Sequence, residues 1–324
     1  MKVFNYQKIC SDLISKLSKR EKEVISRRFG LDGKERETLE AVGNGFGICR
    51  ERVRQIQKAS FDKIKKRTEK YQKVFSHFLE YFKESGGLRK EDVLLKELGQ
   101  EKEGNEVYFL LTLQEPFQKL NENDDLYSLW TIDENSHLLA KRAINSVFSQ
   151  LKKIKKPLLL QKLNKVSLTE KVLASYLQVS KKIQKNEDNL YGLSYWPEIN
   201  PRGVKDKAYL VFKKVKKPLH FSEVANLVEK SHIQTVHNEL IKDNRFVLVG
   251  RGIYALAEWG YYPGQVKDVI VKTLKQAGEP LTKEEVLEEV LKQRLIKRNT
   301  ILLNLGNKEY FLKDSEGRYQ IKQI

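Results

Sequence analysis

The sequence predicts a mainly α-helical chain with small β-hairpin wings, in which an N-terminal helix-turn-helix is followed by four tandem winged-helix-like modules. Residues 38–57 read TLEAVGNGFGICRERVRQIQ, which is a short helical pattern, a glycine-containing turn and a longer amphipathic helical pattern. Four tyrosines then recur at spacings of 64, 63 and 65 residues: Tyr127, Tyr191, Tyr254 and Tyr319. Repetition at this period argues for tandem modules built from the same elements.

The helix-turn-helix is expected to begin with a short helix over residues 38 to about 44 and to continue with a longer helix from about residue 50 to 66. Between them lies a turn punctuated by Gly43, Gly45 and Gly47. Such a run also occurs in phosphate-binding loops, but no strand precedes it and no Gly-Lys-Ser/Thr follows, so a turn is favoured. The buried face of the longer helix is marked by residues at helical spacing: Val53, Ile56 and Ile64, with Ser60 or Phe61 between them.

The opposite face of the longer helix predicts contact with DNA. Arg and Gln side chains pair with guanine and adenine edges through two hydrogen bonds, and a recognition helix contacts bases through its N-terminal residues. The residues predicted to contact DNA are Arg50, Glu51, Arg52, Arg54, Gln55 and Lys58. A charged helix face is often only solvated, but the helix-turn-helix spacing favours base contact here.

Two segments, LSKREKEVISRRFGLDG (17–33) and TLEAVGNGFGICRERVRQIQKAS (38–60), resemble region 4 of sigma-70 type bacterial sigma factors, over about residues 10–68. The resemblance implies a domain that reads the upstream promoter hexamer and docks on the flap of the RNA polymerase β subunit. It assigns base reading to Arg50, Glu51, Arg54 and Gln55, and flap contact to the side formed by residues 17–33. This chain departs from the pattern at two positions: Cys49 replaces a capping Thr or Ser, which should cost about 1 kcal/mol, and Gly45 replaces a charged residue.

The flap-contacting side begins with a helix of its own. A capping box from Ser18 to Glu21 predicts where this helix starts, and Gly30 predicts where it ends. The residues that it would present are Val24, Ile25, Arg28 and Phe29. If the domain only reads DNA, the same residues would serve simply as a scaffold for the helix-turn-helix.

The repeated part of the chain predicts a helix, a Pro-Leu turn, two further helices and a β-hairpin in each module. An apolar residue precedes each of the last three tyrosines by eight positions, with a turn-rich gap between the two: Ile183, Phe246 and Phe311. That is a hairpin signature, and the first copy has a slightly longer turn. The predicted domains are residues 1–70, 71–135, 136–200, 201–262 and 263–324.

The third module resembles the HARE helix-turn-helix over about residues 203–262, and the resemblance extends more loosely to residue 324. It depends on PLHFSEV and RFVLVGRGIYAL. The family occurs in the delta subunit of some bacterial RNA polymerases, beside restriction endonuclease domains and in eukaryotic chromatin proteins. Arg251, at the predicted wing tip, is a phosphate-contact hypothesis. The tryptophans near the wings are expected to pack in cores or between modules, and the lysines of LKKIKKP and FKKVKKP to close helices.

Composition favours a polyanionic partner. The chain of 324 residues carries a net charge of +18, and residues 1–70 hold 19 Lys or Arg against 10 Asp or Glu. No signal peptide is expected, and the longest uncharged apolar run, residues 107–113, is too short to span a bilayer, so we expect a cytoplasmic, nucleoid-associated protein without membrane contact. Two cysteines imply no disulfide framework.

Catalytic, metal-binding and cofactor-binding motifs are not evident in the sequence, so we expect no enzyme and no cofactor. Nothing resembles sigma region 2 either. The main hypothesis is a sequence-specific transcription regulator of sigma region 4 type, which reads promoter-like double-stranded DNA through residues 50–58 and adds DNA or protein contacts through its winged helices. An alternative is a non-enzymatic RNA polymerase accessory subunit that docks on the β flap. A weaker alternative is the DNA-targeting component of a restriction or modification system.

Overall fold

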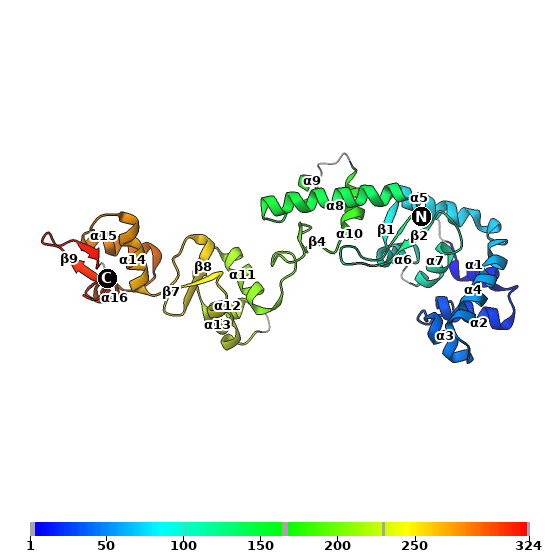
Figure 1. Cartoon of the computed structure of the whole chain (residues 1–324), viewed down its shortest axis with the longest axis horizontal. Coiled ribbons are helices and arrows are strands. Elements are labelled where there is room, and N and C mark those ends of the chain that lie inside the picture. Colours follow the sequence, from blue (N-terminus) through cyan, green and yellow to red (C-terminus); the bar gives the residue numbers. More distant parts are fainter. Residues whose placement is uncertain (1–3, 101, 164–167, 229–230, 323–324) are drawn as a thin grey trace. The chain divides into compact units, whose positions relative to one another are not determined.

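The computed structural model describes residues 4–100, 102–163, 168–228 and 231–322. It is mainly helical with small antiparallel sheets, which confirms the predicted fold class (Figure 1). The chain forms two compact units, Met1–Tyr195 and Trp196–Ile324. The division into five domains stays a prediction, because each compact unit holds more than one of them.

The first unit starts with the helix-turn-helix and the two helices that support it. They are α1 (Tyr6–Ile14), α2 (Lys19–Phe29), α3 (Leu39–Phe46) and α4 (Arg50–Lys65), followed by a 3₁₀ turn, η1 (Thr68–Tyr71). The predicted capping box of α2 is present between Ser18 and Glu21, and Gly30 ends the helix in the left-handed conformation at φ +66°.

One boundary within the helix-turn-helix was predicted wrongly. We expected the first helix to end near residue 44, but α3 continues through Gly45 to Phe46, and only Gly47 adopts the left-handed conformation, at φ +63°. Glycine lowers helix stability by only about 1 kcal/mol, and the packing of α3 on its neighbours outweighs that local preference. The turn is therefore short, from Gly47 to Cys49.

The rest of the first unit contains two helix–hairpin segments. The first consists of α5 (Gln72–Glu84), β1 (Leu88–Lys90), α6 (Glu91–Leu98), α7 (Gly104–Leu111), β2 (Gln118–Leu120) and β3 (Leu129–Thr131). Its three strands form one antiparallel sheet in the order β1-β3-β2. The second consists of α8 (Glu134–Ile154), α9 (Leu160–Leu163), α10 (Glu170–Gln178), β4 (Ile183–Lys185) and β5 (Tyr191–Leu193).

The second unit contains two more such segments. The third consists of α11 (Gly203–Val215), β6 (Leu219–His220), α12 (Phe221–Leu227), α13 (Ile233–Lys242), β7 (Phe246–Gly250) and β8 (Ile253–Leu256), with a 3₁₀ turn, η2 (Ala257–Trp259). Its sheet order, β6-β8-β7, repeats that of the first segment. The fourth consists of α14 (Val266–Ala277), α15 (Lys283–Gln293), α16 (Arg298–Leu305), β9 (Phe311–Lys313) and β10 (Tyr319–Ile321).

The periodic tyrosines occupy equivalent places in three of the four segments. Tyr191, Tyr254 and Tyr319 lie in the second strand of their hairpins. Each also pairs with the leucine of the preceding Pro-Leu turn, at Leu158, Leu219 and Leu281. Tyr127 is the exception, because it lies two residues before β3 and outside any strand. The longer turn of the first hairpin shifts its register, so this tyrosine does not mark a strand.

A single hydrophobic core joins the N-terminal helices to the first helix–hairpin segment. The ring of Phe29 lies 5.1 Å from that of Phe109 in α7, and Phe61 of α4 lies 6.1 Å from the same ring. Tyr6 of α1 similarly packs on Phe78 of α5 at 5.7 Å. The helices of residues 1–70 therefore share part of their core with the first helix–hairpin segment.

Candidate nucleic-acid interface

Helix α4 presents the predicted DNA-contacting residues on its solvent face. Val53, Ser60 and Ile64 are buried beneath it, so the helix has one face in the core and one in solvent. All six predicted residues are exposed: Arg50, Glu51, Arg52, Arg54, Gln55 and Lys58. Their exposure agrees with a role in contacting DNA, and the contacts themselves stay a prediction.

A small apolar cluster holds α4 against the two helices that precede it. Val24 of α2, Val42 of α3 and Val53 of α4 are fully buried together. The half-buried residues around them, including Phe46 and Ile48, face inward as the sequence predicted. Because each helix contributes one of the three valines, the cluster fixes the angle at which α4 presents its exposed face.

Two glycines of α3 lie so close to neighbouring atoms that a side chain would collide with them. A Cβ atom added at Gly43 would lie 2.6 Å from the carbonyl oxygen of Ile48, so this backbone contact requires glycine. A Cβ at Gly45 would lie 2.5 Å from the guanidinium of Arg27. That guanidinium donates two hydrogen bonds to Glu37, at 2.8 and 2.7 Å, and they hold the pKa of Glu37 below its usual value. Any side chain at position 45 would therefore meet Arg27 in this arrangement.

Three of the predicted base readers, Glu51, Arg54 and Gln55, form hydrogen bonds with neighbours on the same helix. Arg54 donates to both carboxylate oxygens of Glu51, at 2.9 and 2.7 Å, and Arg52 donates to the amide oxygen of Gln55 at 3.0 Å. The hydrogen bonds from Arg54 lower the pKa of Glu51, and those to Glu51 raise the pKa of Arg54. More than half of each side chain is exposed, 57% for Arg54 and 56% for Glu51, so this pair can open when a nucleic acid approaches.

The first turn of α4 lacks a side-chain cap. Cys49 occupies the N-cap position with extended backbone, and its side chain accepts no hydrogen bond from the helix. By contrast, Thr38 caps α3 by accepting from the backbone N–H of Ala41 at 3.1 Å. Because Cys49 replaces the Thr or Ser of the family pattern, α4 lacks a side-chain cap, as the sequence predicted.

The side of the domain expected to dock on a polymerase flap is covered by the chain itself. Val24, Ile25 and Phe29 are buried, and Arg28 donates to the backbone oxygen of Glu37. Asn105, in α7, donates to the backbone oxygens of Gly30 and Lys34, at 3.1 and 3.0 Å. The guanidinium of Arg36 lies 4.0 Å from the centre of the Tyr108 ring. Sequence reasoning missed this role of α7; the signal that could have found it is the uncharged apolar run at residues 107–113, which we used only to exclude a membrane span.

The third helix of each helix–hairpin segment in the first unit, α7 and α10, packs against other parts of that unit. In α7, the buried residues include Val107, Phe109 and Leu110. In α10, Ser175 donates to the backbone oxygen of Leu88 at 3.0 Å, and Tyr176 donates to that of Gly86 at 2.8 Å. Helix α7 therefore has no exposed residue, and α10 exposes only Glu170, Lys171 and Gln178, so neither presents a basic face of the kind that a winged helix places in a DNA groove.

Third helices of the second unit are more open and carry exposed apolar residues. Ile233 and Ile241 on α13 are 48% and 61% exposed, and Leu303 on α16 is 80% exposed. Arg251 is exposed in the turn between β7 and β8, where Gly252 adopts φ +70°. The structure thus places Arg251 at a hairpin tip, and its contact with phosphate stays a prediction.

The tryptophans and the helix-closing lysines behave as the sequence indicated. Trp130 is buried, and its indole N–H donates to Glu91 at 2.9 Å. Trp259 packs against Phe212 at 6.2 Å between ring centres, and Trp196 is half-buried. Helices α8 and α11 end at Lys155 and Lys216, both of which adopt the left-handed conformation at φ +57°.

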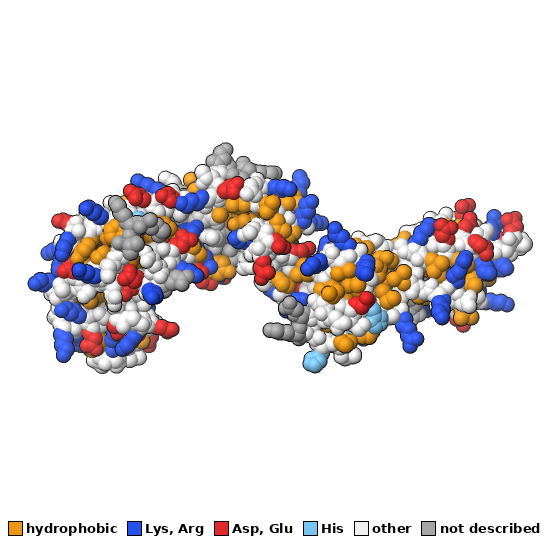
Figure 2. Space-filling view, turned by 180° about the vertical axis from the view of Figure 1, so that it is seen from behind, with side chains coloured by type: hydrophobic (Ala, Val, Ile, Leu, Met, Phe, Trp, Pro, Cys, Tyr) orange, Lys and Arg blue, Asp and Glu red, His pale blue; other side chains and the backbone are white. Residues whose placement is uncertain are grey.

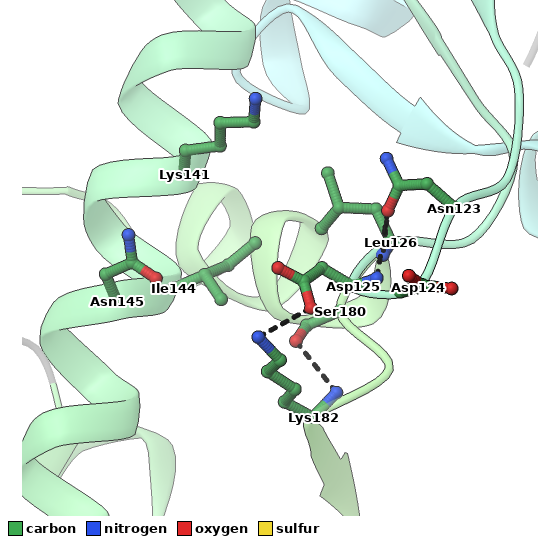
Figure 3. A pocket seen from close by; sticks show the side chains of 9 residues that line it. All are labelled: Asn123, Asp124, Asp125, Leu126, Lys141, Ile144, Asn145, Ser180 and Lys182. Atoms are coloured by element: carbon green, nitrogen blue, oxygen red, sulfur yellow. Dashed lines mark hydrogen bonds and ion pairs between the residues drawn. The ribbon is translucent and has the colours of Figure 1, made fainter.

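A cleft of about 380 Å³ lies between the loop after β2, helix α8 and the start of β4 (Figure 3). Asp125 and Lys182 form an ion pair at 2.5 Å in its wall, and Lys141 of α8 lines its rim. The described residues contain no group of three or more His, Cys, Asp or Glu side chains that could hold a metal ion. None of the helices in the described ranges has the length and apolar character required to cross a membrane.

Comparison with known proteins identifies the N-terminal part of the chain. Residues 13–66 match the family Sigma-70, region 4. A relative named RNA polymerase sigma factor SigA, from Bacillus sp, is 44% identical over 54 residues. That match covers 17% of this chain and 14% of the relative. The helix-turn-helix is therefore a sigma-70 region 4 domain, which is a DNA-binding and non-enzymatic domain.

Proposed function

We propose that this chain is a sequence-specific, DNA-binding transcription regulator that reads a promoter-like site through α4. The observation that carries the proposal is the exposed row of Arg, Glu, Gln and Lys side chains on α4, within a region 4 domain whose valine cluster fixes the orientation of the helix. Arg and Gln are suited to pair with base edges in the major groove. Such a regulator would act in the cytoplasm, associated with the nucleoid.

The second unit supports a role in additional contacts. Residues 203–262 carry the HARE-type pattern, and their elements follow the helix–strand–helix–helix–hairpin order of a winged helix. Arg251 at the hairpin tip is suited to a phosphate, since it is exposed on a short turn.

The region 4 match is the observation that favours a second candidate function, an accessory subunit associated with RNA polymerase. Docking on the β flap through α2 is disfavoured, since Phe29 and its neighbours pack against α7. A polymerase contact through the second unit remains compatible with this arrangement. The DNA-targeting role in a restriction or modification system has only the HARE-type pattern in its favour.

Selection of duplex DNA from a random-sequence pool by the purified full chain tests the main proposal. We expect the bound fraction to become enriched in one short motif, and substitution of Arg54 by Ala to weaken that enrichment. If the bound pool stays random in sequence, the regulator proposal fails. If the bound pool stays random and the chain co-purifies with polymerase from its host, the accessory-subunit function replaces the regulator proposal.

A further inference from the structure

We infer that the outward face of α8 is a second DNA-contacting surface, which binds phosphates without reading sequence. We call this surface the α8 basic face and define it by the cations Arg142, Lys152, Lys153, Lys155 and Lys156. The inference rests on the proposed DNA-binding function and adds a separate site to it.

The segment around α8 contains basic residues but no acidic ones. Residues 135–169 contain eight Lys or Arg and no Asp or Glu. The preceding residues, 71–135, contain seven Lys or Arg and fourteen Asp or Glu, so the first helix–hairpin segment is acidic. Basic residues in the first unit are therefore concentrated in two places, the region 4 domain and the segment that begins with α8.

The geometry of α8 separates its cations from its core contacts. Its buried residues lie on one side, at Ala140, Ala143, Ile144, Val147 and Leu151. At 100° per residue, Arg142, Ser149, Lys152 and Lys153 fall on the opposite side, and all four are exposed. Lys155 and Lys156 continue the surface past the end of the helix, where Figure 2 shows Lys and Arg side chains gathered.

None of the five cations forms an ion pair with a residue in the described ranges. At the equivalent end of α11, Lys213 differs from its counterpart Lys152, because Lys213 binds Glu258 at 2.7 Å and lies over the ring of Tyr209. Stabilisation of a helix C-terminus accounts for Lys152 and Lys153, which lie in the last turn. It does not account for Arg142, which lies almost three turns earlier.

The chemistry of the surface favours a phosphate backbone over a membrane. Lys, Arg and Ser are among the side chains that most often donate to phosphate oxygens. A helix that lies on a membrane needs its main apolar face free to enter the lipid, whereas Ala140, Ala143, Ile144, Val147 and Leu151 of α8 are in the core. Three further apolar residues of α8 are exposed, Leu138 and Leu139 in its first turns and Ile154 at its end, so they form no continuous apolar face. From Arg142 to Lys153 the helix spans about 17 Å, a length over which B-DNA carries about ten phosphate charges.

One end of α8 is less suited to DNA. Lys141 lines the cleft that also contains Asp124 and Asp125 (Figure 3), so carboxylates face this end of the helix. The C-terminal half, with Lys152, Lys153, Lys155 and Lys156, is therefore the part that we expect to contact phosphates most closely.

The test is the salt dependence of duplex binding by the full chain and by the triple variant K153Q/K155Q/K156Q. Each phosphate contact contributes about 0.9 to the slope of log K against log salt. We expect the triple variant to lower this slope by about two to three, equally on the preferred site and on random duplex. The charge-retaining variant K153R/K155R/K156R should keep the original slope, and thermal unfolding shows whether each variant is folded.

The matched control is K214Q/K216Q/K217Q, which removes the same three charges from the equivalent positions of α11 and should leave the slope unchanged. An unchanged slope in the α8 variant would overturn the inference, as would equal losses in both variants. The same titrations also measure how strongly the chain prefers its own site over random duplex, which tests the proposed function. The α8 inference can therefore fail while the proposed function holds. If the unaltered chain binds no duplex at all, the proposed function and the α8 surface fail together.

Discussion

Phe29, the last residue of α2, packs edge-on against Phe109 of α7 with 5.1 Å between the ring centres. The two residues belong to different predicted domains, so this contact joins the region 4 domain to the first helix–hairpin segment. It also buries part of the side through which the family resemblance implied docking on polymerase. The orientation of α4 and the surface left for partners both depend on this shared core.

Loss of the Phe109 ring should destabilise the first unit strongly. Phe109→Ala removes a fully buried ring that contacts both Phe29 and Phe61, and we expect a loss of about 3–5 kcal/mol in the free energy of unfolding. Leu303→Ala, at an 80% exposed position, is the control and should change stability by less than about 0.5 kcal/mol. Urea unfolding of the full chain measures both, and a loss below about 1 kcal/mol for Phe109→Ala would contradict the shared core.

Arg54→Ala should lower the preference for the selected DNA site over random duplex by about tenfold to a hundredfold, because a side chain that pairs with a base edge is lost. Lys65→Ala is the control, since Lys65 lies on the same helix but at its far end. It should weaken binding to all duplexes slightly and equally. Equal weakening on both DNAs by Arg54→Ala would show that Arg54 contacts phosphate only.

A cap at the start of α4 should stabilise the helix-turn-helix. Cys49→Ser supplies a hydroxyl at an N-cap position that now lacks a side-chain hydrogen bond, and we expect a gain of about 1 kcal/mol. Thr38→Ala, which removes the existing cap of α3, should cost a similar amount. Thermal unfolding compares the unaltered chain with the variants Cys49→Ser, Cys49→Ala and Thr38→Ala, and the prediction is wrong if Cys49→Ser gains no more stability than Cys49→Ala.

The two glycines within α3 should respond differently to alanine. Gly43→Ala places a Cβ against the backbone oxygen of Ile48, and we expect a loss of about 1–3 kcal/mol despite the better helix propensity of alanine. Gly45→Ala meets only the end of the Arg27 side chain, which can move, so its cost should be smaller. Denaturant titrations rank the two variants, and the reverse order would contradict the close approach at Gly43.

A fragment of the polymerase β flap should not bind the full chain through α2. The reason is that Val24, Ile25 and Phe29 are buried, and α7 covers this side of the helix. Binding of the fragment at micromolar concentration, measured by calorimetry, would contradict this prediction and favour the accessory-subunit function. Arg20→Glu, at an exposed position of α2, would then show whether α2 is the site.

The sequence by itself determined the local structure around the candidate interface. The capping box at Ser18, the helix end at Gly30 and the two faces of α4 were all predicted, because caps and helical periodicity act within a few residues. The hairpins that contain Tyr191, Tyr254 and Tyr319 were predicted for the same reason.

Only the tertiary structure decided which surfaces remain open. An apolar pattern in α7 says that one face is buried but not against which partner, and the structure places it on α2. The continuation of α3 to Phe46, the pairing of Arg54 with Glu51 and the position of Tyr127 outside a strand likewise depend on neighbours and on side-chain conformation. Packing between elements far apart in sequence leaves no periodic signal in either one, so the covering of α2 by α7 could not be read from residue spacing, although the exposed face of α4 could.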